Sequence, residues 1–117
     1  MEKRVPLQTT EHKFFKQVLE LLNPMLRLRH KELDVLAELM YRYHQLANVP
    51  KEHRMRIILD ASSRKAMRMS LKQTEAAFNN NLSRLKKYKY LTEEGFKSFL
   101  DFPYSKDFKL TFIFNGN

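Results

Sequence analysis

Apolar residues recur at helical spacing through the first three quarters of this 117-residue chain. In the first such segment Phe14, Val18, Leu21 and Leu22 fall on one stripe, as they would on the buried side of an amphipathic helix, and Pro24 follows them. Similar stripes, separated by proline and by capping residues such as Asp60, Ser62 and Ser63, predict five helices, at residues 10–22, 30–47, 51–60, 63–71 and 75–88.

Two short stretches leave the local structure open. The run RMRIIL, inside the third predicted helix, is also compatible with a strand. The residues Leu26, Arg27 and Leu28, which follow Pro24, are expected to be extended and to form at most a minimal strand.

The pattern changes from helical to alternating near the C-terminus. Apolar side chains there occupy every second position: Phe108, Leu110, Phe112 and Phe114. This alternation predicts a strand over residues 108–114, and we expect its partner near Tyr90–Thr92. The expected fold class is therefore α+β, mainly α, with a C-terminal β-hairpin, in a single domain spanning residues 1–117.

Composition narrows the class of protein. No apolar run reaches the length of a membrane span, the N-terminus lacks the apolar stretch of a signal peptide, and there is no cysteine. We therefore expect a cytoplasmic protein with no membrane partner. The four histidines are not paired at helical spacing, and two glycines cannot build a phosphate-binding loop. A non-enzymatic protein with no metal and no cofactor is expected.

The net charge of +9 is concentrated in one part of the chain. Residues 51–90 contain eleven Lys or Arg and three acids, which gives +8 for this segment, whereas residues 1–50 give +2 and residues 91–117 give −1. A local excess of this kind indicates a polyanionic partner, with nucleic acid first. The alternative is a solvated basic face that only keeps the protein soluble.

The stretch TEAAFNNNLSRLKKYKYL, which starts at Thr74, contains the fifth predicted helix. On a helical projection Phe78, Leu82 and Leu85 form its buried stripe, and Thr74 can cap its start. The opposite face carries amide, small, hydroxyl and basic side chains: Gln73, Ala76, Asn80, Ser83, Arg84 and Lys87. Such a face suits the major groove of double-stranded DNA, because Asn and Gln can pair with adenine and Arg with guanine.

This interpretation assigns a role to each residue of the face. Gln73, Asn80 and Arg84 are expected to contact base edges, and small residues such as Ala76 to allow close approach, while Ser83 adds a hydroxyl to the same face. The expected phosphate contacts come from basic residues at the helix ends and on the preceding helix: Lys72, Lys87, Lys89, Arg64 and Arg68. Alternatively, the run Asn79–Asn81 is plain solvated surface on a weak helix.

The segment SSRKAMRMSLKQTEAAFNNNLSRLKKYKYL resembles the helix-turn-helix of winged-helix proteins. Met67 and Leu71 match buried positions of the first helix, and Thr74 matches the cap of the recognition helix. The resemblance implies a winged helix-turn-helix with an N-terminal helical extension at 1–25, the helix-turn-helix at 63–88 and a wing at 90–114.

Together with FKLTFIF near the C-terminus, this segment is most similar to small winged-helix proteins of tailed bacteriophages, including crAss-like phages. That similarity implies transcription regulation or phage genome handling in the bacterial host cell. Three positions depart from the family pattern. Lys72 and Gln73 stand where Gly and an aliphatic residue are usual, and Lys89 stands where Gly usually ends the recognition helix.

A second function remains open, because many winged helices bind proteins rather than DNA. In that case the chain would be an interaction module, serving as a structural or assembly component of a phage particle (a virion component) or of packaging or replication machinery. Its partners would then be phage structural or replication proteins, bound through an exposed apolar patch for which the candidates are Tyr88, Tyr90, Phe102 and Ile113. A homodimer is open under either function.

Overall fold

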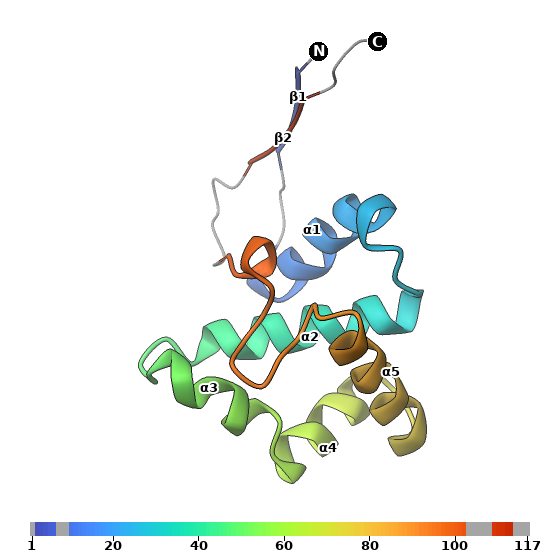
Figure 1. Ribbon diagram of the computed structural model, residues 1–117, viewed down its shortest axis with the longest axis vertical. Coiled ribbons are helices and arrows are strands. Elements are labelled where there is room, and N and C mark those ends of the chain that lie inside the picture. The colour runs from blue at the N-terminus through green and yellow to red at the C-terminus, as the bar shows by residue number, and fades with distance from the viewer. Residues whose placement is uncertain (1, 7–9, 103–108, 114–117) are drawn as a thin grey trace.

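The computed structural model describes the backbone of residues 2–6, 10–102 and 109–113, and the side chains of residues 10–102. The body of the protein is helical (Figure 1). Its helices in chain order are α1 (Glu11–Leu26), α2 (His30–Gln45), α3 (Lys51–Ile58), α4 (Ala61–Ser70) and α5 (Glu75–Lys87). A short 3-10 turn, η1 (Ser98–Leu100), follows them.

Helix α2 is the centre of the body. In Figure 1 it crosses the middle of the molecule, with α1 on one side and α3, α4 and α5 on the other. A helix that is apolar on most sides must be covered on most sides, and α2 buries seven apolar or aromatic side chains: Leu33, Val35, Leu36, Ala37, Leu39, Met40 and Tyr43. The same core takes Phe14 and Phe15 from α1 and Phe78 and Leu85 from α5.

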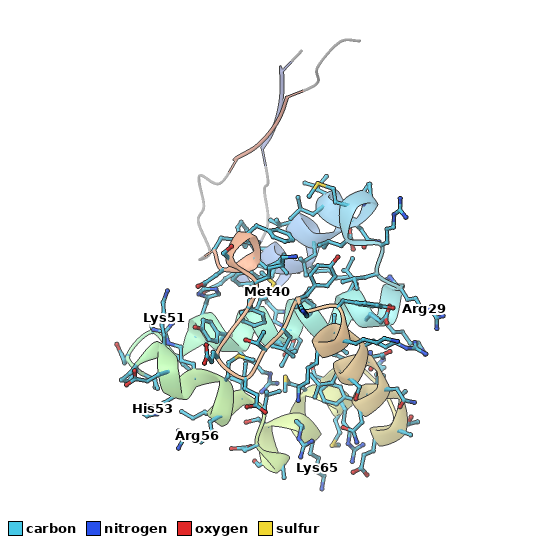
Figure 2. All side chains as sticks on the ribbon, in the orientation of Figure 1. Arg29, Met40, Lys51, His53, Arg56 and Lys65 are labelled. Carbon is cyan, nitrogen blue, oxygen red and sulfur yellow. The ribbon has the colours of Figure 1, made fainter. Side chains whose placement is uncertain are left out.

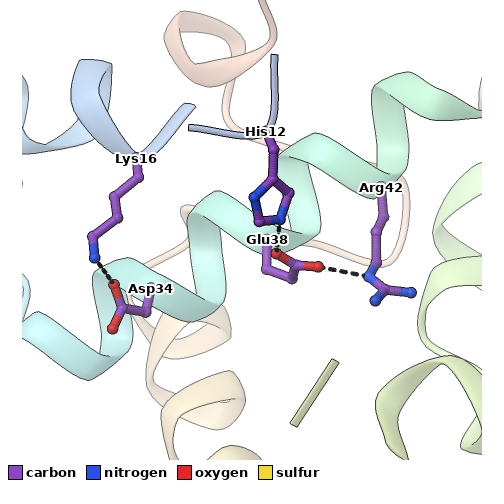
Figure 3. Close-up of polar contacts among 5 residues, drawn as sticks. All are labelled: His12, Lys16, Asp34, Glu38 and Arg42. Atoms are coloured by element: carbon purple, nitrogen blue, oxygen red, sulfur yellow. Dashed lines mark hydrogen bonds and ion pairs between the residues drawn. The ribbon is translucent and has the colours of Figure 1, made fainter. Parts of the chain in front are cut away.

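Ion pairs join α1 to α2 at the edge of this core (Figure 3). The Nζ atom of Lys16 lies 3.0 Å from Oδ1 of Asp34, and Nε2 of His12 lies 3.2 Å from Oε2 of Glu38. Arg42 also donates from Nε to Oε1 of Glu38, at 2.9 Å. Asp34 and Glu38 of α2 are thus balanced by nearby basic side chains of α1 and α2.

Four of the predicted helices agree with the structure to within about two residues at each end. The predicted caps of α4 and α5 are present: Asp60 Oδ1 accepts from the Ser63 backbone N–H at 2.7 Å, and Thr74 Oγ1 accepts from that of Ala77 at 3.1 Å. The run RMRIIL lies in helix α3 except for its last residue, Leu59, which caps the helix, so the strand alternative for it is wrong.

The end of the first helix was predicted wrongly. Pro24 lies inside α1, which continues to Leu26, and residues 26–28 form no strand. The side chain of Asn23 closes this end, because its Oδ1 accepts from the Leu28 backbone N–H at 3.0 Å and its Nδ2 donates to the Leu28 carbonyl at 3.1 Å. The helix therefore does not end at the proline, as was expected, and the amide of Asn23 holds the residues that follow it.

The α+β winged helix with a C-terminal β-hairpin wing is also wrong. After α5 the chain makes an isolated bridge between Leu91 and Phe96 and then the turn η1, and Tyr90–Thr92 pairs with no C-terminal strand. The described strands are β1 (Glu2–Pro6) and β2 (Lys109–Ile113), which pair antiparallel with each other. The expected strand ends, Phe108 and Phe114, lie outside the described residues, as do residues 103–107.

The reason is that alternation predicts a strand but does not name its partner. Leu91 and Leu100 are both fully buried in the helical core. The segment that was expected to form the first wing strand is therefore held against the helices, and β2 pairs with the other end of the chain (Figure 1).

Candidate nucleic-acid interface

Helices α4 and α5 are joined by a tight turn. The Gln73 backbone N–H donates to the Arg68 carbonyl at 2.8 Å, and that of Lys72 donates to the Met69 carbonyl at 3.1 Å. These two hydrogen bonds define a Schellman motif, which ends a helix with one residue in the left-handed conformation. That residue is Lys72, with φ 56°. The chain then enters α5 at its cap, and residues 61–87 form a helix, a turn and a second helix.

The other end of α5 has the same construction. The Tyr90 backbone N–H donates to the Leu85 carbonyl at 3.1 Å, the Lys89 N–H donates to the Lys86 carbonyl at 3.0 Å, and Lys89 has φ 63°. Glycine is the usual residue at such positions, and a residue with a side chain costs about 1–2 kcal/mol there. Lys72 and Lys89 therefore keep the backbone turn at positions where glycine was expected, and they place a cation at each end of α5.

The outward face of α5 carries four of the predicted site residues. Ala76, Asn80, Ser83 and Lys87 are all exposed, and their spacing of four, three and four residues places them on one side of the helix. Phe78, Leu82 and Leu85 are buried on the other side, which the helical projection predicted.

Two further exposed residues lie beside this face. Asn79 is adjacent to Asn80 and one helical turn from both Ala76 and Ser83, and Lys86 precedes Lys87. Neither was in the predicted site. The run Arg-Leu-Lys-Lys was the signal for Lys86, since a helix that buries Leu85 exposes both of the following lysines.

Gln73 is not on the exposed face. It is buried, and its Oε1 accepts a hydrogen bond of 3.0 Å from Nδ2 of Asn81, which is 7% exposed. Its Nε2 donates to the Lys31 carbonyl at 3.4 Å. A base contact by Gln73 would break these internal bonds, so its amide serves to hold the turn against α2 and α5.

Arg84 faces a buried carboxylate. Its Nη1 lies 3.8 Å from Oε2 of Glu32, a side chain that is 2% exposed, while Arg84 itself is 42% exposed. The other oxygen of Glu32, Oε1, accepts from the Arg29 backbone N–H at 2.8 Å at the start of α2. Arg84 therefore balances an interior charge and presents only part of its guanidinium to solvent.

Arg64 and Arg68 are half-buried on α4, beside a hollow of about 290 Å³ between α4 and α5. The hollow is lined by residues of both helices: Ala61, Arg64, Lys65, Arg68, Glu75, Phe78 and Asn79. Lys65 is exposed and projects from α4 (Figure 2). Cations from α4 thus stand next to the face of α5.

The positive charge of this region is largely uncompensated by the side chains that the structure describes. Residues 61–92 contain one acid, Glu75, and eight basic residues: Arg64, Lys65, Arg68, Lys72, Arg84, Lys86, Lys87 and Lys89. Among the described residues, Arg84 alone of these eight takes part in an ion pair. A surface of this kind raises the local potential and attracts a polyanion.

Comparison of the chain with protein-family models, with curated proteins and with solved structures found no match. In the described part of the chain no group of three or more His, Asp or Glu residues is placed to hold a metal ion. None of the described helices combines the length and the apolar character that crossing a membrane requires.

Proposed function

We propose that this protein binds double-stranded DNA without catalysing a reaction, and that α5 lies in the major groove. The observation that carries the proposal is the exposed face of Ala76, Asn80, Ser83 and Lys87, which holds no acid and follows a tight turn from α4. Asn80 can pair with adenine, and small side chains at 76 and 83 let the helix approach the base edges.

The cations around α5 suit contacts with the phosphate backbone, which position a protein on the duplex. Lys72 and Lys89 stand at the two ends of the helix in a backbone conformation that disfavours any residue with a side chain. A cost of that kind often accompanies a function of the side chain. Here the function would be phosphate binding, shared with Lys87 and with Arg64 and Arg68 of α4.

Contact by a wing is not part of this proposal, since no wing hairpin forms in the described chain. The resemblance of residues 63–91 to phage helix-turn-helix segments supports a role in transcription regulation or phage genome handling. That role would place the protein in the cytoplasm of a bacterial host.

The alternative is an interaction module that docks the same surface on an acidic protein, such as a phage structural or replication protein. Exposed apolar residues favour it, because Met69 and Tyr88 both lie within the basic region. Of the other residues expected to form an apolar docking patch, Tyr90 and Phe102 are half-buried against the core, and the side chain of Ile113 lies outside the described residues.

Selection from a randomised duplex library tests the proposal. The parent protein should enrich a short motif, and Asn80→Ala should lose the preference at one base pair by about 1–3 kcal/mol while the remaining positions stay selected. Ile57→Ala, at an exposed position of α3, is the control and should select the parent motif. A parent protein that binds no duplex at low salt would favour the interaction module.

A further inference from the structure

Three aromatic rings form a row where α5 ends. Tyr88 packs edge-to-face against Tyr90 with ring centroids 6.2 Å apart, and Tyr90 packs in the same way against Phe99 of η1 at 6.4 Å. Tyr90 is anchored, because its hydroxyl donates to the Leu26 carbonyl at 3.1 Å. The row is therefore fixed to the end of α1 as well as to α5.

The outer rings of this row face solvent. Tyr88 is 46% exposed and Phe99 is 43% exposed, so each offers part of its ring to a ligand. The neighbouring residues Leu91 and Leu100 are buried in the core, whereas these two rings lie outside it. A single exposed aromatic residue is ordinary on a protein surface, but two that flank an anchored third make a continuous platform.

Cations accompany the platform. Lys97 Nζ lies 5.9 Å from the ring centre of Tyr90 and 5.7 Å from that of Phe99, and Lys89 lies between the two tyrosines in sequence. Within the described residues neither lysine is paired with a carboxylate.

The acids of the same segment lie on its other side, toward α3, where, of these described residues, Asp101 alone is paired with a cation. Asp101 Oδ2 lies 3.6 Å from Lys51 Nζ, and Glu93 and Glu94 line a hollow with Met55. The platform thus keeps its positive charge and complements a polyanion.

We propose that the row of Tyr88, Tyr90 and Phe99 binds single-stranded nucleic acid. Unpaired bases stack on the exposed rings of Tyr88 and Phe99, and Lys89 and Lys97 contact the phosphates. Aromatic rings that alternate with cations are the features that single-strand binding needs, since every base has a face that can stack. This surface adjoins the α5 face proposed for duplex DNA and shares Lys89 with it, but its aromatic rings lie outside that face. The proposal therefore does not depend on duplex binding.

The test compares two labelled probes at low salt by fluorescence anisotropy: an oligothymidylate of about twelve nucleotides and a duplex of the same length. Tyr88→Leu and Phe99→Leu keep apolar bulk and remove the ring. Each should weaken binding of the single strand by roughly fivefold to 150-fold, the range that loss of one stacked base produces. Binding of the duplex should change by less than about threefold, as should both affinities in the control Ile57→Ala.

A second readout covers the case in which a leucine variant does not fold. The chain contains no tryptophan, so Tyr88→Trp introduces a single tryptophan at the platform, whose fluorescence can be excited apart from that of the tyrosines. Its emission should be quenched in a saturable manner by the oligothymidylate. Absence of quenching at low salt, or leucine variants that bind the single strand as well as the parent does, would overturn the proposal. The exposed rings would then be assigned to a protein partner.

Discussion

Arg84 on α5 and Glu32 on α2 place opposite charges 3.8 Å apart at the junction between the candidate interface and the core. The carboxylate is almost fully buried, and its Oε2 has no hydrogen bond among the described residues. A buried charge is costly unless an opposite charge is close to it. Arg84 is thus a structural residue that also reaches the surface where DNA is proposed to bind.

The first prediction concerns this pair. Arg84→Ala should lower the free energy of unfolding by about 1–3 kcal/mol, less than for a fully buried pair because Arg84 is partly exposed. Glu32→Gln removes the buried charge, so Arg84→Ala should cost clearly less in that background. Urea denaturation of the four proteins of this double-mutant cycle measures the coupling. A coupling near zero would show that Arg84 does not stabilise Glu32.

The second prediction separates the asparagines of α5. Asn81→Ala leaves the buried amide of Gln73 with an unpaired acceptor and should destabilise the protein by about 1–3 kcal/mol. Asn79→Ala is the matched control, since Asn79 is exposed and alanine is the better helix former. It should be neutral or stabilise by about 0.5 kcal/mol. Thermal denaturation checks both, and equal effects of the two substitutions would contradict the assignment.

The third prediction concerns the left-handed lysines. Lys72→Gly and Lys89→Gly should each stabilise the fold by about 0.5–1 kcal/mol, because glycine adopts their conformation without steric cost but loses more entropy on folding. Each variant should also bind duplex DNA more weakly, since a cation is removed. A variant that is more stable and binds DNA as the parent does would remove that lysine from the proposed phosphate contacts.

His44 gives the fold a dependence on pH. Its ring stacks on Phe15 with centroids 5.4 Å apart, and burial lowers its pKa from the usual 6.5. The carboxylate of Asp101, whose Oδ1 lies 3.9 Å from His44 Nε2, raises the pKa, while Arg54 and Lys51 lower it further. The folded protein therefore binds a proton at this site less readily than the unfolded chain does.

The fourth prediction follows from that sign. The contribution of neutral His44 to stability is fully present above pH 6.5 and is lost as the pH falls from there through the lowered pKa, because the unfolded state binds the proton first. His44→Gln should flatten this part of the stability profile. Urea denaturation at a series of pH values measures it, and identical profiles for parent and variant would rule out His44 as the cause.

The helices were predictable from the sequence because both their periodicity and their caps are local. Asp60 and Thr74 cap α4 and α5 where the residue types indicated. The wing was not predictable, since the partner of residues 108–114 depends on which distant segment is free to pair. The end of α1 was placed too early for a related reason. Pro24 was read as the end of the helix, but the amide of Asn23 closes that end through contacts that the proline does not determine.

The candidate site was predictable in part. A helical projection gives the exposed positions Ala76, Asn80, Ser83 and Lys87 without further information. It cannot show that the side chains of Gln73 and Asn81 are hydrogen-bonded to each other, nor that Arg84 of α5 faces Glu32 of α2. Polar residues at the edge of a buried stripe can turn inward or outward, and the partner that decides lies elsewhere in the chain.

The proposed interface is tested most directly by the salt dependence of duplex binding. Lys86→Ala/Lys87→Ala removes two exposed cations from the end of α5 and leaves the Arg84–Glu32 pair intact. Arg56→Ala, on α3, removes a cation of the same basic segment outside α4 and α5 (Figure 2). Fluorescence anisotropy with a random-sequence duplex at several salt concentrations gives the slope of the log binding constant against the log salt concentration, and this slope should be steep for the parent. In the double variant the slope should be smaller by about 0.9 for each lost phosphate contact, and in Arg56→Ala it should be unchanged. Equal slopes for all three proteins would contradict binding through α5.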